Sequence, residues 1–241
     1  MRRRESVSLA FCPVLADMIK ANSASGRTGK LLDLGSLSTS NNLATLRQLH
    51  LAWEAMHTLE IGFACGGSAL VFTQTHKDLG SPPNHQHVAI DPYQRSHWID
   101  ESGLVAVERA KLDGYLHFIE DVSSYALPEL VKRGDKFDLI YIDGSHLFED
   151  VFVDFYYAAR LLADGGLIIF DDCTNPHVRK VLRYIKRSFP ISLPEFDLFT
   201  YRYNVAYYHY SLARAFGRLQ MKAFRRVNDP VREWNSAFRN F

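Results

Sequence analysis

The chain has 241 residues, 47% of them hydrophobic, and its 28 Lys and Arg nearly balance 27 Asp and Glu, for a formal net charge of +1. So many apolar residues and so little net charge exclude a disordered chain. A dedicated nucleic-acid-binding protein is disfavoured as well, because a phosphate backbone calls for a clear positive excess. The length suits one large α/β domain or two small ones.

The three cysteines, Cys12, Cys65 and Cys173, lie far apart in the sequence, and no CxxC motif occurs. This pattern favours neither a disulfide scaffold nor a cysteine-based zinc site. We therefore expect a reducing compartment and a cytoplasmic location.

The N-terminus resembles a signal peptide at first sight, because a basic start, Met1–Arg4, precedes the apolar run Val7–Ala16. Pro13 interrupts that run, and Asp17 ends it without a clean cleavage site. We interpret the segment as a mobile arm or a first helix. No apolar run in the sequence is long enough to span a bilayer.

From residue 20 onward the sequence alternates between loop, helix and strand patterns. Residues 20–37 are predicted as a loop, and Ser38 or Ser40 could cap a helix that runs to about Met56. The predicted strands are Thr58–Ile61, His87–Ile90, Leu116–Ile119, Asp138–Ile142 and Leu167–Phe170. The predicted helices that follow are Ser68–Thr75, Glu149–Leu162 (ended by Gly165 and Gly166) and His177–Phe189.

Strands with nearly continuous apolar character, alternating with helices, indicate a parallel sheet covered on both faces. Such sheets bind ligands in a crevice at the carboxyl ends of the strands. The residues just after each strand therefore carry most of the functional information.

The first strand leads into the glycine turn Glu60–Ser68. Glycines let the backbone approach a ligand closely, and the following helix offers free N–H groups. The spacing is not the GxGxxG of dinucleotide enzymes. Glu60 would repel a pyrophosphate and fits a ligand with a cation or an amine; a purely structural turn is the alternative.

Polar residues also follow the second and third strands. Asp91 is placed to accept hydrogen bonds from both hydroxyls of a ribose, although it could be a solvated loop residue. Ser123 could read the edge of an adenine, or could simply stand near a helix N-terminus.

Three carboxylates follow the fourth and fifth strands: Asp143, Asp171 and Asp172. If the two strands are neighbours, these groups converge and raise one another's pKa unless a cation joins them. Oxygen ligands suit Mg²⁺, Mn²⁺ or Ca²⁺ better than zinc. In the alternative, Asp171 or Asp172 caps the next helix and no metal binds.

Taken together, Glu60–Gly66, Asp91, FDLIYIDGSH (137–146) and LLADGGLIIFDD (161–172) resemble the motifs of class I S-adenosylmethionine (SAM)-dependent methyltransferases. The sequence is similar to the branch of macrocin-type sugar O-methyltransferases and cephalosporin-hydroxylase-like proteins, related to cation-dependent catechol and caffeoyl-CoA O-methyltransferases. The resemblance implies a Rossmann-like, doubly wound, mostly parallel seven-stranded α/β sheet with helices on both faces and an antiparallel C-terminal hairpin.

The resemblance also implies roles for single residues. Asp143, Asp171 and Asp172 match metal ligands, which would hold Mg²⁺ or another divalent cation. His146 stands where the catechol-type enzymes have a lysine general base, and Asp143 joins it in the catalytic set. Ala64 replaces the middle glycine of the fullest glycine motif. The predicted SAM-binding residues are Glu60, Gly62, Phe63, Gly66, Ser68, Asp91, Pro92, Ser123 and Asp143.

The expected reaction is metal-assisted O-methylation of a small molecule or sugar, in which a cation lowers the pKa of a hydroxyl and His146 removes its proton. A sugar, catechol or polyketide diol would chelate best. The alternatives are metal-independent methyl transfer, hydroxylase-like chemistry on the same fold, an NAD-dependent dehydrogenase, which the missing GxGxxG disfavours, and a non-catalytic binding protein.

The C-terminal third is predicted to finish the sheet with a hairpin over Phe196–Tyr210 and to end in a basic helix over Ser211–Val227. This tail could pack on the body or on a second subunit of a homo-oligomer, or could contact an anionic substrate or a membrane surface. We expect an N-terminal arm with cap helices (1–57), a SAM-binding domain (58–210) and a basic helical tail (211–241).

Overall fold

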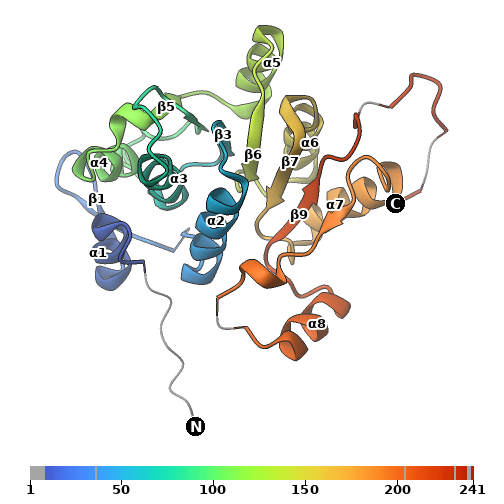
Figure 1. Cartoon of the computed structure of the whole chain (residues 1–241). Coiled ribbons are helices and arrows are strands. Elements are labelled where there is room, and N and C mark those ends of the chain that lie inside the picture. Colours follow the sequence, from blue (N-terminus) through green and yellow to red (C-terminus); the bar gives the residue numbers. More distant parts are fainter. Residues whose placement is uncertain (1–8, 36, 204, 231, 238–239) are drawn as a thin grey trace.

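The computed structural model describes residues 9–35, 37–203, 205–230, 232–237 and 240–241. Its centre is a seven-stranded sheet in the order β5-β4-β3-β6-β7-β9-β8, in which β5 to β7 run parallel and β9 and β8 antiparallel (Figure 1). The strands are β3 (Thr58–Ile61), β4 (His87–Ile90), β5 (Leu116–Ile119), β6 (Phe137–Ile142), β7 (Leu162–Phe170), β8 (Glu195–Phe196) and β9 (Lys222–Arg225).

Helices cover both faces of this sheet because its strands are apolar on both sides. Side chains alternate along a strand, so that Leu139 and Tyr141 of β6 face one core and Ile140 and Ile142 face the other. One face carries α2 (Ser40–Trp53), α3 (Gly67–Asp78) and α4 (Ser102–Arg109), and the other α5 (Ser123–Arg133), α6 (Phe148–Leu161) and α7 (Pro176–Ser188) (Figure 1). The predicted doubly wound α/β sheet with an antiparallel C-terminal pair is confirmed.

The N-terminal part contains a first helix, and it differs from the sequence expectation in the following loop and in the cap of α2. Helix α1 (Pro13–Ala21) starts at the proline that interrupts the apolar run, whereas the basic start of that run lies outside the described residues. The predicted loop contains a short antiparallel ribbon, β1 (Ser23–Ser25) and β2 (Leu31–Asp33). Helix α2 is capped by Thr39, whose hydroxyl accepts a hydrogen bond from the Asn42 N–H, rather than by Ser38 or Ser40.

The five predicted strands are all present, three of them with the predicted bounds. The expected glycine stop of α6 is wrong, because the helix ends at Leu161 and continues directly into β7. Gly165 and Gly166 lie inside β7, where a Cβ on Gly166 would come within 2.7 Å of the Asp138 carbonyl oxygen. Gly166 therefore serves a close strand contact, whereas Gly165 has φ +76° with nothing within 4 Å of an added Cβ.

The C-terminal predictions are partly wrong. The antiparallel pair is formed by β8 and β9, which are separated by the 3₁₀ turn Phe199–Tyr201 and by α8 (Tyr207–Ala215). The basic helix predicted over Ser211–Val227 ends at Ala215, and its later part inserts into the sheet as β9 beside β7. Buried Ala223 and Phe224 explain the insertion, because a strand can bury both of these neighbours in opposite faces of the sheet. No helix in the described part of the chain is long and apolar enough to cross a membrane.

Candidate active site

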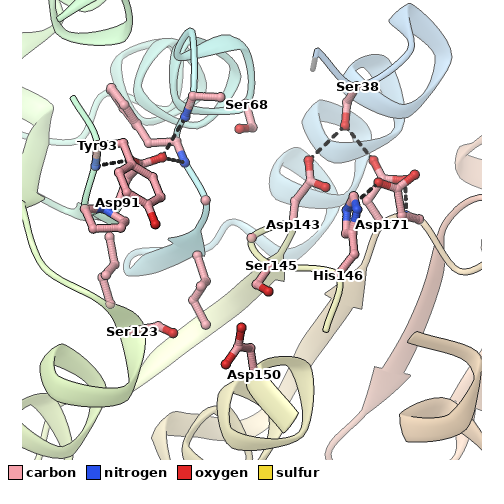
Figure 2. A pocket seen from close by; sticks show the side chains of 18 of the residues that line it. Ser38, Ser68, Asp91, Tyr93, Ser123, Asp143, Ser145, His146, Asp150 and Asp171 are labelled. Carbon is pink, nitrogen blue, oxygen red and sulfur yellow. Dashed lines mark hydrogen bonds and ion pairs between the residues drawn. The ribbon is translucent and has the colours of Figure 1, made fainter. Parts of the chain in front are cut away.

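A cavity of about 990 Å³ opens at the carboxyl ends of β3, β4, β6 and β7 (Figure 2). The strand order reverses between β3 and β6, and open α/β sheets bind ligands at such a switch point. Residues of α2, of the loops after each strand, and of the segment before β9 complete its wall.

Asp91, at the end of β4, holds the glycine turn through its carboxylate. One oxygen, Oδ2, accepts hydrogen bonds from the N–H groups of Phe63 and Ala64, both at 3.0 Å, and Oδ1 accepts one from the Tyr93 N–H at 2.8 Å. A carboxylate offers about four lone-pair positions, so Oδ1 keeps one free for a ligand. Asp91 therefore both shapes the turn and faces the cavity.

Gly62 and Gly66 of the turn are required to be glycine for different structural reasons. Gly62 has φ +92°, and a Cβ there would stand 2.1 Å from the Asp143 carbonyl oxygen. Gly66 has φ +77°, and its Cβ would meet Gly103 of α4 at 2.9 Å. Gly62 therefore lets β3 and β6 close together at the cavity, whereas Gly66 serves helix packing and does not line the cavity.

Glu60 lies in the core and is fully buried, contrary to the prediction that it lines the cofactor site. Alternation along β3 turns it to the same face as Thr58, under α2 and α3. Its Oε1 is 3.3 Å from Nε2 of the buried His87, an ion-pair distance without hydrogen-bond alignment. Thr58 Oγ1 links His87 Nδ1 (2.8 Å) to His76 Nε2 (2.9 Å).

Asp171, at the end of β7, is surrounded by donors from distant parts of the chain. Its Oδ2 accepts hydrogen bonds from Ser38 Oγ at 2.5 Å and from the Tyr141 hydroxyl at 2.6 Å. Asn42 Nδ2 donates to both of its oxygens, and the Arg202 guanidinium donates to Asn42 Oδ1 at 2.7 Å. Asp171 is thus the centre of a hydrogen-bond network that joins α2 to the C-terminal segment.

Asp143, His146 and Asp172 form the group that could hold a metal. Within the described residues, one ligand atom of each lies within 4.8 Å of the others. His146 Nε2 is 2.7 Å from Asp172 Oδ2, and Gln220 Nε2 donates to Asp172 Oδ1. Asp171 lies beside this group, because Ser38 Oγ and the Tyr141 hydroxyl each contact both its carboxylate and that of Asp143.

The electrostatics of this group follow from burial and from like charges. Burial raises the pKa of Asp143 well above its usual range, and the neighbouring charges of Asp171 and Asp172 raise it further. The Tyr141 hydroxyl, buried between Asp143 and Asp171, also has a raised pKa, first through burial and then through those two charges. A cation in this group would offset both effects.

Of the predicted site residues, all except Glu60 and Gly66 line one cavity: Gly62, Phe63, Ser68, Asp91, Pro92, Ser123, Asp143, His146, Asp171 and Asp172. The sequence interpretation missed Ser38, Asn42, Asp150 and Gln220 on the wall, and Tyr141 and Arg202 behind it. Only Asp150 carried a sequence signal, since it is an acidic residue four positions after His146, at the start of the predicted helix.

Comparison with known proteins agrees with this architecture. Residues 59–173 match the family model of a methyltransferase domain. No curated protein matches the chain.

Solved structures share the fold at low sequence identity. The O-methyltransferase from Bacillus cereus in complex with SAH is 18% identical, with a TM-score of 0.60 over 76% of this chain and 82% of that one. TomG, an O-methyltransferase from Streptomyces achromogenes involved in tomaymycin synthesis and solved with SAM, is 20% identical, with a TM-score of 0.59 over 76% and 81%. Cofactor-bound Rv0187 from MTB is also 20% identical, with a TM-score of 0.58 over 76% and 81%. Residues 59–173 of this chain thus carry the sequence pattern of a methyltransferase domain, on a fold shared with SAM- and SAH-bound O-methyltransferases.

Proposed function

We propose that the protein is a SAM-dependent methyltransferase that methylates a hydroxyl group. The observation that carries this proposal is one cavity at the sheet's switch point, with Asp91 on one side and Asp143 and His146 on the other (Figure 2). Asp172 groups with Asp143 and His146. The methyltransferase-domain match over residues 59–173 and the cofactor-bound neighbours support SAM as the cofactor.

In this proposal the cofactor lies across the carboxyl ends of β3 and β4. The free lone pair of Asp91 Oδ1 would accept a hydrogen bond from a ribose hydroxyl, and the open backbone of Gly62 would face the methionine part. Ser123, at the start of α5, lines the cavity where an adenine would follow the ribose. This orientation directs the sulfonium methyl toward Asp143 and His146.

His146 would take the proton of the methyl acceptor. Its ring is about half exposed, and the contact of Nε2 with Asp172 Oδ2 at 2.7 Å favours the proton on Nε2. The lone pair then lies on Nδ1, where it can accept the proton of a hydroxyl. As the acceptor oxygen forms its bond to the methyl carbon, the carbon–sulfur bond breaks, its electron pair stays on sulfur, and S-adenosylhomocysteine (SAH) leaves.

A divalent cation fits the donor set of this site. Asp143 and Asp172 offer carboxylate oxygens to the cavity, and the raised pKa of the half-buried Asp143 carboxyl indicates a place where positive charge is favourable. Bound there, a cation would supply Lewis-acid activation of the acceptor hydroxyl. His146 belongs to the same group. Because about half of its ring is exposed, we assign His146 the role of proton acceptor rather than that of metal ligand.

The charge of the cavity indicates which methyl acceptors fit. Its described wall contains five carboxylates and neither Lys nor Arg: Asp91, Asp143, Asp150, Asp171 and Asp172. We therefore propose a neutral or positively charged acceptor in place of the anionic substrate considered from the basic tail. Part of the tail's charge already serves the fold, since Arg226 pairs with Asp164 at 2.9 Å and Lys222 with Glu195 at 3.7 Å.

Ligand binding tests the cofactor assignment directly. SAH at about 100 times its dissociation constant should stabilise the protein by about 2.7 kcal/mol, which raises the melting temperature by roughly 5–10 °C, whereas NAD should not. Asp91→Asn should weaken this shift, and Asp121→Asn, an exposed acid after β5 that does not line the cavity, should preserve it. A shift with NAD alone would favour a dehydrogenase.

The catalytic roles are tested with catechol as a neutral probe acceptor and SAH release as the readout. His146→Gln should lower the rate by about 10²–10⁴-fold, the usual contribution of a general base. If EDTA and Asp143→Ala both leave methyl transfer intact, metal assistance is wrong, and metal-independent transfer takes its place.

A further inference from the structure

Part of the cavity wall is an apolar slot between the first turns of α5 and α6. Val122, Tyr125, Leu147 and Val153 line it. The first three are 37%, 69% and 52% exposed, which leaves large apolar surfaces uncovered beside a cavity. Such walls suit a flat, weakly hydrated ring.

One carboxylate, that of Asp150, stands in this slot. Asp150 belongs to the first turn of α6, one helical turn before Val153, and Figure 2 shows it pointing into the cavity near Ser145. It is half-buried and forms no ion pair with a Lys, Arg or His of the described residues. An ionised carboxylate only accepts hydrogen bonds, so the Asp150 side chain can take an N–H or O–H group of a ligand.

Ser123, the first residue of α5, lines the same cavity. A serine hydroxyl has two lone pairs, so it can accept a hydrogen bond from a ligand. Figure 2 shows Ser123 and Asp150 on the same side of the cavity.

We propose that Asp150 is a specificity residue that accepts a hydrogen bond from the exocyclic 6-amino group of the cofactor's adenine. This inference rests on the proposed function, which places the adenine in the slot next to Ser123. The Asp150 carboxylate, together with the Ser123 hydroxyl, which can also accept, matches a group with two N–H donors. Hypoxanthine, the base of inosine, carries a carbonyl oxygen in place of the 6-amino group. That oxygen would face the Asp150 carboxylate with no proton between the two acceptors.

Calorimetric titration at pH 8 with SAH and with S-inosylhomocysteine tests the proposal. The full chain should bind SAH about 10- to 100-fold more tightly, as expected for a hydrogen bond to a charged group. Asp150→Asn should reduce this preference to about threefold or less, because an amide can rotate to donate to the carbonyl oxygen. Asp150→Ala should weaken SAH binding and leave S-inosylhomocysteine binding nearly unchanged.

Glu149→Gln is the matched control, since Glu149 lies in the same first turn of α6 but is exposed and does not line the cavity. This variant should keep the full preference for SAH. Retention of the preference in Asp150→Asn, or its loss in Glu149→Gln, would overturn the assignment while SAH binding itself upholds the proposed function. Failure of the unmodified chain to bind SAH would overturn both.

Discussion

Asn42 Nδ2 donates hydrogen bonds to both carboxylate oxygens of Asp171, at 2.9 and 3.1 Å, across 129 positions of sequence. Arg202 supports the contact from behind, because its guanidinium donates to the amide oxygen of Asn42. Asn42 precedes residues 59–173 and Arg202 follows them, so both segments outside the matched domain contribute to one carboxylate of the candidate site.

Replacing Asn42 should destabilise the protein. Asn42→Ala removes two hydrogen bonds to a buried carboxylate and leaves the half-buried Arg202 guanidinium without that partner, at a cost of about 2–3 kcal/mol. The melting temperature should fall by roughly 4–10 °C. Asn41→Ala is the matched control, since the neighbouring amide donates to the Tyr203 carbonyl oxygen at 2.7 Å instead of to Asp171. Equal melting temperatures for the two variants would contradict a special role of Asn42.

Gly62→Ala should damage both the fold and cofactor binding. A positive φ alone costs a non-glycine residue about 1–2 kcal/mol, and at Gly62 the new methyl group would also collide with the Asp143 carbonyl oxygen. Gly134→Ala isolates the first effect, because Gly134 has φ +79° and nothing within 4 Å of the added Cβ. Chemical denaturation should find Gly62→Ala at least about 2 kcal/mol less stable than Gly134→Ala, and titration should find weaker SAH binding in Gly62→Ala only.

Stability should decline as the pH falls below about 6.5. Burial is the main cause that lowers the pKa of His50 to about 4 and of His76 to about 2 in the folded state. In the unfolded chain both side chains take up protons near pH 6.5, so acid favours unfolding, and above that pH neither residue contributes to pH dependence. Each contributes a slope of about 1.4 kcal/mol per pH unit between roughly pH 6 and pH 4.

Urea denaturation between pH 7.5 and pH 4.5 measures that slope. His76→Gln should reduce this slope by about 1.4 kcal/mol per pH unit, the contribution of one proton. His97→Gln, at an exposed position, should leave the slope unchanged. A slope that is the same in the unmodified chain and in His76→Gln would contradict the buried, uncharged state of His76.

The three thiols should be unreactive in the folded protein. Cys12, Cys65 and Cys173 are free and buried, and burial is the largest cause of the raised pKa of each. A thiol reagent attacks the thiolate, so labelling should be nearly absent at pH 8 and should reach all three residues in denaturant. Rapid labelling of one thiol without denaturant would show that its region opens.

The sheet was predictable because its strands are short apolar runs that end at turns. Both faces of such strands are apolar, so the sheet is buried only when a layer of helices covers each face. The same logic placed Asp91, Asp143 and Asp172 together, since the carboxyl ends of adjacent parallel strands meet at one edge. The direction of Glu60 was not predicted, because the glycine-turn motif is silent about which face of β3 a side chain takes.

The sequence by itself determined the class of fold, the residues that follow each parallel strand and most of the cavity wall, because these depend on local periodicity and on residues next to strand ends. Only the tertiary structure decided that Asp171 turns to Asn42 and Ser38, that Gln220 holds Asp172, and that Lys222–Arg225 is a strand. Each of these depends on a partner far away in the chain, and local pattern carries no information about which distant donor or strand will arrive.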